Sequence, residues 1–137
     1  MIEELVIASS MNDIDRARQF VEECLLPLNI SRKERSNVMF CLVEAVVNAV
    51  NHGNGGDPSK KVRITFRADD AKVTVSVSDE GPGFDPEKIP DPTAPEEISR
   101  PTGRGIFFMR QMMSALSFDF SPAGTTVTMT KNYNGKH

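Results

Sequence analysis

Residues 44–53 constrain this chain more than any other segment, because they place polar groups on one side of an otherwise apolar helix; they read Glu-Ala-Val-Val-Asn-Ala-Val-Asn-His-Gly. At about 100° per residue, Glu44, Asn48 and His52 fall within about 80° of one another. The apolar side chains that point the opposite way are Leu42, Val46, Ala49 and Val50. The apolar face must pack, and the other face presents a carboxylate, a carboxamide and an imidazole. An ordinary solvent-exposed helix face has the same pattern, so this spacing alone does not identify a functional site.

A second group of polar residues follows a predicted strand. Residues 73–78 alternate between apolar and polar side chains, and residues 79–85 then read Asp-Glu-Gly-Pro-Gly-Phe-Asp. Asp79 is thus expected at the end of a strand. Gly81 and Gly83 flank a proline, which gives the loop a sharp and defined shape. An ordinary turn has a similar composition, so this loop is informative only together with the other motifs.

Two further motifs lie nearer the C-terminus. Gly103, Arg104 and Gly105 precede an apolar run over residues 106–116, for which we predict a helix. Glycines before a helix allow phosphate oxygens to approach its free backbone N–H groups. Gly-Thr-Thr at 124–126 then leads into alternating residues that predict a strand.

In this order and spacing, the four motifs resemble the four conserved boxes of the GHKL ATPases, a superfamily that includes gyrase, histidine kinases, mismatch-repair proteins and a heat-shock chaperone. Within it the chain is most similar to the small bacterial anti-sigma-factor serine kinases. The motifs that carry the resemblance are Glu-Ala-x-x-Asn-Ala-x-x-His-Gly and Asp-Glu-Gly-Pro-Gly-Phe. The resemblance covers nearly the whole chain. It implies one histidine-kinase-like ATPase domain over residues 1–137, with a Bergerat-type ATP-binding fold.

The remaining periodicity is consistent with such a fold. We expect a strand over residues 4–8 and a helix over residues 13–26, capped by Ser10 or Asn12. The buried stripe expected on this helix consists of Ile14, Ala17, Val21 and Cys24. Ser31 and Glu34 have the spacing of a capping box and begin the helix that carries Glu44.

Two alternating runs then predict a β-hairpin, with Val62, Ile64 and Phe66 facing Val73, Val75 and Val77. The simplest architecture is an α/β (α+β) two-layer sandwich, in which helices cover one face of a mixed or antiparallel sheet. Residues 86–102 are the exception, because their five prolines are incompatible with a regular element. By resemblance, this segment is the ATP lid, a cover that closes over the triphosphate.

Composition excludes several classes of function. Sixteen basic against nineteen acidic residues give a formal charge of -3, which provides no broad basic field for nucleic acid. No apolar run reaches the length of a membrane span, and the N-terminus does not resemble a signal peptide, so we expect a cytoplasmic protein. Cys24 and Cys41 lie among apolar neighbours and are expected to be reduced packing residues.

If the ligand is ATP, the groups that an ATP pocket requires predict a role for each polar residue. Asp79 is expected to accept a hydrogen bond from the adenine amino group, which guanine does not offer there. Gly83 lets the backbone approach the base, and Thr126 is expected to bind the same edge directly or through water. Asn48 offers a neutral oxygen to Mg²⁺, which bridges the phosphates and keeps several waters. Asn51 either contacts phosphate or faces solvent.

Phosphate transfer requires further groups. By resemblance, Glu44 is the general base that accepts a proton from the attacking hydroxyl. The attacking group would be a serine or threonine of a small anti-anti-sigma protein with a STAS domain. Arg104 is placed to neutralise charge on the transferring phosphoryl group, and Gly103 and Gly105 to let phosphate approach. His52 is expected to pack or support the site rather than to accept phosphate.

The resemblance also implies partners. A sigma factor would be sequestered, Arg18 would contribute to partner docking, and a homodimer is expected; direct nucleic-acid and membrane binding are not. The alternative to a kinase is a non-catalytic, nucleotide-sensing module in a partner-switching pathway, for which a lost base would be the signature. A histidine kinase fragment is disfavoured, because the chain has only His52 and His137 and no paired dimerisation helices.

Overall fold

Alternating apolar residues build the centre of the sheet. The computed structural model describes residues 1–81 and 101–135, with side chains for all of these except 101–104. Strands β2 (Lys61–Ala68) and β3 (Lys72–Ser78) form the predicted antiparallel hairpin. All six apolar residues expected to face inward are buried; they are Val62, Ile64, Phe66, Val73, Val75 and Val77.

Three more strands extend this hairpin on both sides. They are β1 (Ile2–Ala8), β4 (Ala115–Ser121) and β5 (Gly124–Asn132). The order in the sheet is β1-β2-β3-β5-β4, and every neighbouring pair is antiparallel. β5 therefore lies beside β3, and this brings the Gly-Thr-Thr motif, which forms the start of β5, next to the end of β3 and to Asp79 directly after it.

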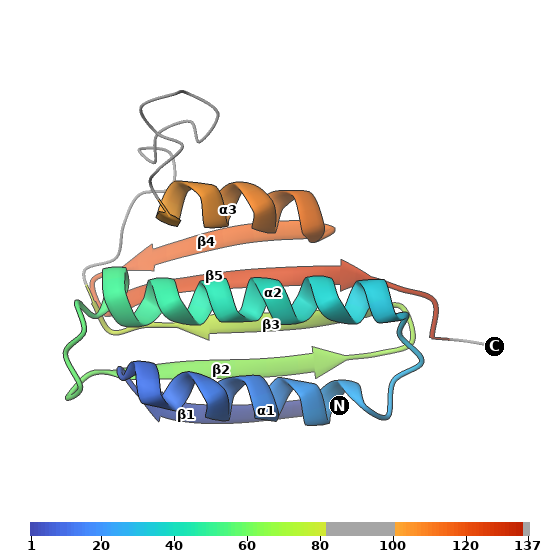
Figure 1. Cartoon of the computed structure of the whole chain (residues 1–137), viewed down its shortest axis with the longest axis horizontal. Coiled ribbons are helices and arrows are strands. Elements are labelled where there is room, and N and C mark those ends of the chain that lie inside the picture. The colour runs from blue at the N-terminus through green and yellow to red at the C-terminus, as the bar shows by residue number, and fades with distance from the viewer. Residues whose placement is uncertain (82–100, 136–137) are drawn as a thin grey trace.

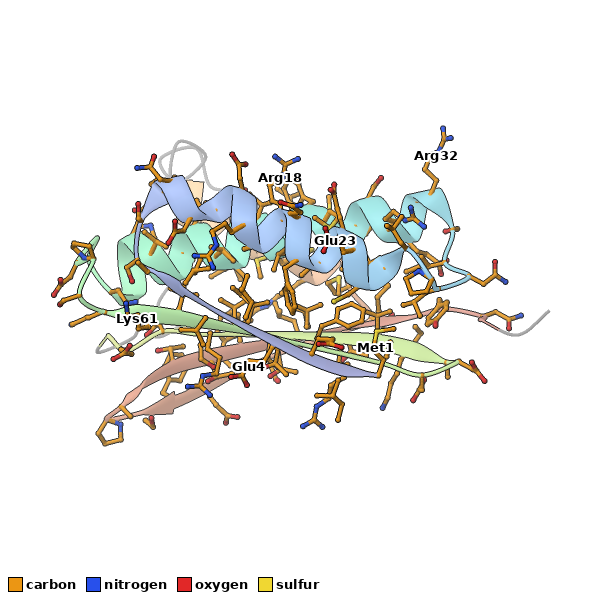
Figure 2. All side chains as sticks on the ribbon, turned by 90° about the horizontal axis from the view of Figure 1, so that it is seen from below. Met1, Glu4, Arg18, Glu23, Arg32 and Lys61 are labelled. Carbon is orange, nitrogen blue, oxygen red and sulfur yellow. The ribbon has the colours of Figure 1, made fainter. Side chains whose placement is uncertain are left out.

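The helices all lie on one face of the sheet, as Figures 1 and 2 show. They are α1 (Ile14–Leu25), α2 (Arg32–Asn48) and α3 (Pro101–Met112), with a 3-10 turn η1 (Met11–Asp13) before α1 and a π-helical turn η2 (Ala49–Gly53) after α2. The buried stripe predicted for α1 faces the sheet, since Ile14, Ala17, Val21 and Cys24 are all buried. The two-layer α+β architecture is thus confirmed, with an antiparallel sheet.

The helix starts follow the predicted caps. The Ser31 hydroxyl accepts a hydrogen bond from the Glu34 N–H at 3.1 Å, and the Glu34 carboxylate accepts one from the Ser31 N–H at 3.1 Å. This reciprocal pair satisfies two backbone donors at the start of α2. The Ser10 hydroxyl accepts from the Asn12 N–H at 3.2 Å and thereby caps η1, one short turn before α1 begins.

The C-terminal third corrects one predicted boundary. The helix expected over residues 106–116 instead spans Pro101–Met112, so Gly103 and Gly105 lie inside α3 rather than before it. Its end is fixed by Lys131 on β5, whose ammonium group donates to the Met112 carbonyl at 2.5 Å. The Ser114 N–H then donates to the Thr130 carbonyl at 2.8 Å, and the chain continues as β4. Competition from β5 therefore ends the helix earlier than its apolar content indicates.

The two cysteines behave as the sequence predicts. Both are buried and unbonded to each other. Burial raises the pKa of the Cys24 thiol, and raises the pKa of Cys41 to about 12, so both sulfurs remain protonated at neutral pH. In the part of the chain that the structure describes, no helix is long and apolar enough to cross a membrane.

Candidate functional site

Asp79 is held at the end of β3 by backbone groups from two directions. Its Oδ1 atom accepts hydrogen bonds from the Gly81 N–H at 3.0 Å and from the Thr125 N–H at 3.1 Å. The backbone N–H of Asp79 donates in turn to the Thr125 carbonyl at 2.9 Å. Burial raises the pKa of the carboxyl group, although these N–H donors act in the opposite direction. One oxygen is thus tied to the fold, and Oδ2 remains as an acceptor for a ligand.

Gly53, the final residue of the 44–53 motif, allows the backbone of this motif to lie close to Asp79. A Cβ atom on Gly53 would overlap the Asp79 carboxylate, and a Cβ atom on Gly81 would overlap the Gly53 carbonyl. Both segments therefore approach more closely than residues with side chains allow. The motif on α2 and the Asp-Glu-Gly-Pro-Gly-Phe motif are in direct contact, and this contact explains why both need glycine.

Asn54 reinforces the same junction, and sequence reasoning did not single it out. Its Oδ1 atom accepts from the Glu80 N–H at 2.7 Å, and its Nδ2 atom donates to the Ser9 hydroxyl at 2.5 Å and to the Lys61 carbonyl at 3.0 Å. The side chain is buried and joins three segments that are distant in sequence. The sequence signal that could have identified Asn54 is its position as a polar residue directly after Gly53. Asn54 positions the Asp79 loop and does not line the cavity beside it.

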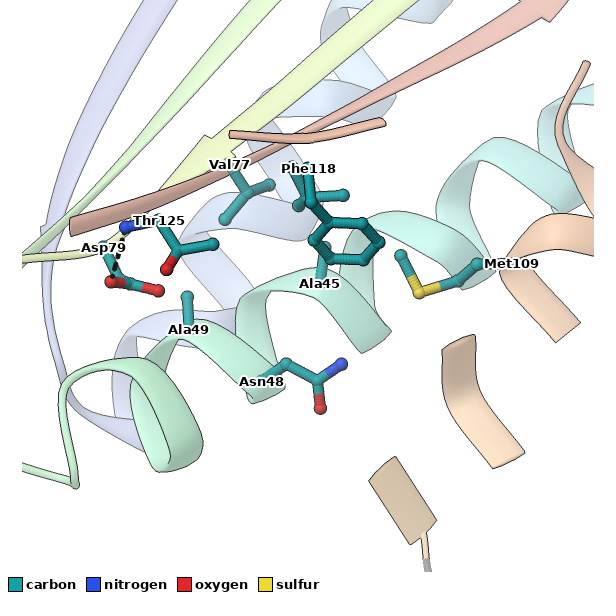
Figure 3. Close-up of a pocket in the computed structure, with 9 residues that line it drawn as sticks. Ala45, Asn48, Ala49, Val77, Asp79, Met109, Phe118 and Thr125 are labelled. Atoms are coloured by element: carbon teal, nitrogen blue, oxygen red, sulfur yellow. Dashed lines mark hydrogen bonds between the residues drawn. The ribbon is translucent and has the colours of Figure 1, made fainter. Parts of the chain in front are cut away.

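A narrow cavity opens beside Asp79 (Figure 3). It is lined by Ala45, Asn48, Ala49, Val77, Asp79, Met109, Phe118, Thr125 and Val127. Its enclosed space measures about 10 Å³, which is room for about one water molecule. A purine is larger, so it lies at the mouth of this cavity or displaces side chains that line it.

The cavity contains a polar atom without a partner. The Thr125 hydroxyl is buried, and among the described residues it makes no hydrogen bond. A buried and unpaired hydroxyl is costly, which points to a ligand that supplies the missing bond. With Asp79 Oδ2 beside it, the site offers an ionisable acceptor and a hydroxyl that both donates and accepts. These groups fit the amino edge of an adenine.

Thr126, the residue predicted for this position, lies on the other face of the sheet. Its hydroxyl pairs with the Ser78 hydroxyl at 2.7 Å. Because side chains alternate along a strand, a shift of one residue changes the face. Thr125 therefore occupies the place that the sequence analysis gave to Thr126.

Asn48 and Glu44 lie one turn apart on α2, as their spacing predicts, but in different surroundings. Asn48 is buried and lines the cavity. Glu44 is half-buried, and burial raises the pKa of its carboxyl group. A Cβ atom on Gly105 would lie 2.5 Å from Glu44 Oε2, so α3 passes this carboxylate closely where it carries a glycine.

His52 lies in the π-helical turn η2 and is exposed, as is Asn51, so it does not pack in the core. Its expected role in supporting the site stays a prediction. Arg104 and Gly103 fall in the first turns of α3, for which the structure describes only the backbone. Gly83 and residues 86–100 of the predicted lid lie outside the described residues, and the final two lid residues begin α3.

A second hollow lies on the outer side of the helices, between α1 and α2. This groove encloses about 560 Å³ and is lined by Met11, Ile14, Asp15, Arg18, Met39, Phe40, Val43, Glu44 and Val47. Arg18 points away from the sheet in Figure 2. Its Nη1 atom lies 3.5 Å from Asp15 Oδ1, and both side chains are exposed. Glu44 thus lines an open and largely apolar groove with its carboxylate close to the α3 backbone, whereas Asn48 lines the cavity.

A model of the histidine kinase-like ATPase domain matches residues 7–131. The chain belongs to this family. This histidine kinase-like ATPase domain is 33% identical over 120 residues to the anti-sigma F factor of Bacillus subtilis, a match that covers 85% of the chain and 82% of that relative. It is 29% identical over 131 residues to the anti-sigma F factor of Oceanobacillus iheyensis, with 93% and 89% covered.

Solved structures share the fold of this ATPase domain. The RsbU and RsbW domains of a Mycobacterium tuberculosis protein match with a TM-score of 0.71 at 18% identity, over 99% of this chain and 34% of that one. The catalytic domain of the histidine kinase ThkA, in a nucleotide-free form, matches with a TM-score of 0.59 at 16% identity, over 99% of both chains. Family membership implies an ATP site, and the cavity at Asp79 has the chemistry for the base.

Proposed function

We propose that this domain is a serine/threonine protein kinase that uses ATP and Mg²⁺ and also acts as an anti-sigma factor. The observation that carries the proposal is the position of Glu44, a half-buried residue that lines an open groove one turn from Asn48, which lines the cavity at Asp79. A base placed between a nucleotide and an outer groove suits transfer to a second protein. The name of the relatives, anti-sigma F factor, supports the regulatory part.

Nucleotide recognition would depend on groups that discriminate between bases. Asp79 Oδ2 accepts from the amino group of adenine, and a guanine presents an oxygen there that an ionised carboxylate repels. The Thr125 hydroxyl, unpaired among the described residues, supports a second contact to the same edge. Gly81 and Gly83 would let the loop backbone approach the base.

Asn48 would contribute the amide oxygen that holds Mg²⁺. The ion would need few protein ligands, because Mg²⁺ usually keeps several waters and would also bind phosphate oxygens of the nucleotide. A neutral amide adds no negative charge next to the triphosphate. When bound, Mg²⁺ would neutralise charge on the phosphate oxygens during transfer.

Transfer would then use Glu44 as the general base. The acceptor hydroxyl oxygen forms a bond to the γ-phosphorus, the bond from that phosphorus to the β–γ bridging oxygen breaks, and ADP leaves. The hydroxyl proton passes to the Glu44 carboxylate, for which a raised pKa favours proton uptake. Arg104 would stabilise the transferring group, and Gly103 and Gly105 would leave room for phosphate at the start of α3.

The acceptor would be a serine or threonine on an anti-anti-sigma protein with a STAS domain. Arg18 lines the same groove as Glu44, which supports its role in partner docking. The sigma factor would be the second partner, and a homodimer in the cytoplasm is the expected form. A formal charge of -3 does not favour direct contact with nucleic acid.

The test is a transfer assay with purified protein, Mg²⁺, γ-labelled ATP and a candidate STAS protein. We expect label on a serine or threonine of the STAS protein, and loss of that label with Glu44→Gln. A matched STAS protein whose acceptor serine is replaced by alanine is the control. ATP binding without transfer to any acceptor would reject the kinase and favour the nucleotide-sensing module.

A further inference from the structure

Two phenylalanines on β4 stand next to the nucleotide cavity. The rings of Phe118 and Phe120 are nearly parallel, with an angle of 9° between their planes and 6.3 Å between their centroids. This is the geometry of an offset aromatic stack. Phe118 lines the cavity, and Phe120 keeps 47% of its surface exposed at the edge of the sheet.

The strand register places this pair in line with the base-recognition groups. Phe120 pairs with Thr125 on β5, and Phe118 pairs with Val127. Directly opposite residues of an antiparallel pair share one face of the sheet, with Cβ atoms about 5 Å apart. The Thr125 N–H in turn donates to Asp79, the residue directly after β3. Phe120, Thr125 and Asp79 therefore form a row at one end of the sheet, across β4, β5 and the end of β3.

We propose that Phe118 and Phe120 form an aromatic wall of the base site, and that the exposed ring of Phe120 packs against the purine of the bound nucleotide. The inference rests on the proposed ATP site at Asp79. The enclosed space that Phe118 helps to line is only about 10 Å³, too little for a purine. A base that donates to Asp79 therefore lies at the mouth of the cavity, where it meets this wall.

The wall adds a property that hydrogen bonding at Asp79 does not supply. Asp79 recognises the amino edge of the base, whereas an aromatic ring contacts its flat face and stabilises any nucleotide with a large π-surface. The two contacts together select for a base that is both large and an amino donor. Phe120 is thus a specificity-determining residue for the nucleotide.

The absence of tryptophan from the sequence allows a direct test. Phe120→Trp introduces the only indole, and a purine stacked on it quenches its fluorescence. We expect a saturable loss of emission as ATP is added, with a midpoint equal to the dissociation constant from calorimetry. Leu26→Trp is the control, because Leu26 follows α1, is exposed and lines neither cavity, so its emission should stay constant.

A second comparison separates stacking from a structural role. Phe120→Ala should weaken ATP binding roughly tenfold, while binding of ribose 5-triphosphate, which lacks the base, stays unchanged. Phe120→Tyr keeps the ring and should retain ATP affinity. An equal loss for both ligands would indicate a structural defect and overturn the proposal.

The failures of the two proposals can be told apart. Unchanged emission of Phe120→Trp while calorimetry shows ATP bound with wild-type affinity would overturn the aromatic wall and leave the ATP site intact. An equal change in the Leu26→Trp control would also overturn it, since the signal would then come from the whole domain. No ATP binding by the wild-type protein would remove the proposed function itself, and the wall with it.

Discussion

Asp79 and Glu44 are both carboxylates whose pKa burial raises, but the fold treats them differently. Asp79 accepts two backbone hydrogen bonds and is enclosed by glycine backbone from another segment. Glu44 is half-buried, and among the side chains and backbone that the structure describes it accepts no hydrogen bond; its close neighbour there is the Gly105 backbone. Asp79 is a fixed acceptor suited to recognition. Among the described residues, both Glu44 oxygens thus remain able to accept a proton, as a general base requires.

Glu44→Gln should produce the largest effect. The amide keeps the size of the side chain but accepts no proton, so transfer should fall by about 10²- to 10⁴-fold. Initial rates of labelled transfer at saturating ATP measure this. Transfer at the wild-type rate would show that Glu44 is not the base.

Asp79→Asn should act on binding. The substituted amide keeps an oxygen for the two backbone donors but presents an amino group where Oδ2 now lies, so the contact to adenine is lost. Hydrogen bonds to charged groups contribute about 1.5–3 kcal/mol, which corresponds to roughly 10- to 150-fold in ATP affinity. Calorimetry with ATP and GTP checks this. A variant that still prefers ATP over GTP by the wild-type ratio would contradict the role of Asp79.

Gly53→Ala should destabilise the end of the site at Asp79 and leave the Glu44 end folded. The added methyl group overlaps the Asp79 carboxylate. Overpacking of this kind costs about 1–3 kcal/mol of unfolding free energy, measured by urea denaturation. The control is Gly55→Asn, at a position with φ 62° and open space around it, where asparagine is tolerated. Equal stability of the two variants would show that the contact at Gly53 relaxes without cost.

The two neighbouring threonines provide a matched pair with a smaller effect. Thr125→Val removes the buried unpaired hydroxyl, so stability should be unchanged or slightly higher, and ATP affinity should fall by about 2- to 12-fold, as for one ordinary hydrogen bond. Thr126→Val loses the hydroxyl pair with Ser78 and should leave ATP affinity unchanged. Weaker ATP binding in Thr126→Val alone would restore the original prediction.

The pH dependence should distinguish Glu44 from an ordinary glutamate. Only the ionised carboxylate accepts a proton, so the rate of phosphate transfer should rise as pH increases through the raised pKa of Glu44. The rise on the acid side of the pH–rate profile should therefore lie at higher pH than for an ordinary glutamate. The folded state also binds this proton more tightly than the unfolded chain. The resulting contribution to stability is full below the unfolded pKa and is lost as pH rises through the folded pKa. Rate profiles and unfolding curves of wild-type and Glu44→Gln protein against pH measure both.

Local patterns predicted much of this fold. The capping box at Ser31, the buried stripe of α1 and the alternating hairpin each depend on residues close in sequence, and each is present. The boundary between α3 and β4 was wrong, because it is set by hydrogen bonds from β5 that no local pattern contains. Ala115 and Leu116, which were expected to end the helix, instead begin the edge strand β4.

The candidate site shows the same limit. Spacing predicted that Glu44 and Asn48 share one side of α2, and the turn after β3 predicted the position of Asp79. The choice between Thr125 and Thr126 depends on the register of β5 against β3, which one residue decides. Asn54 was missed, because its three partners come from segments that meet only in the folded chain. The stacked pair on β4 was missed together with the strand that carries it.

The most direct test of the division between recognition and transfer is ATP affinity measured by calorimetry on Asp79→Asn and Glu44→Gln in parallel, each with its transfer rate. We expect Asp79→Asn to lose affinity, and Glu44→Gln to bind ATP as tightly as the wild-type protein while transferring almost no phosphate. Equal loss of ATP affinity in the two variants would contradict the separate roles of these carboxylates.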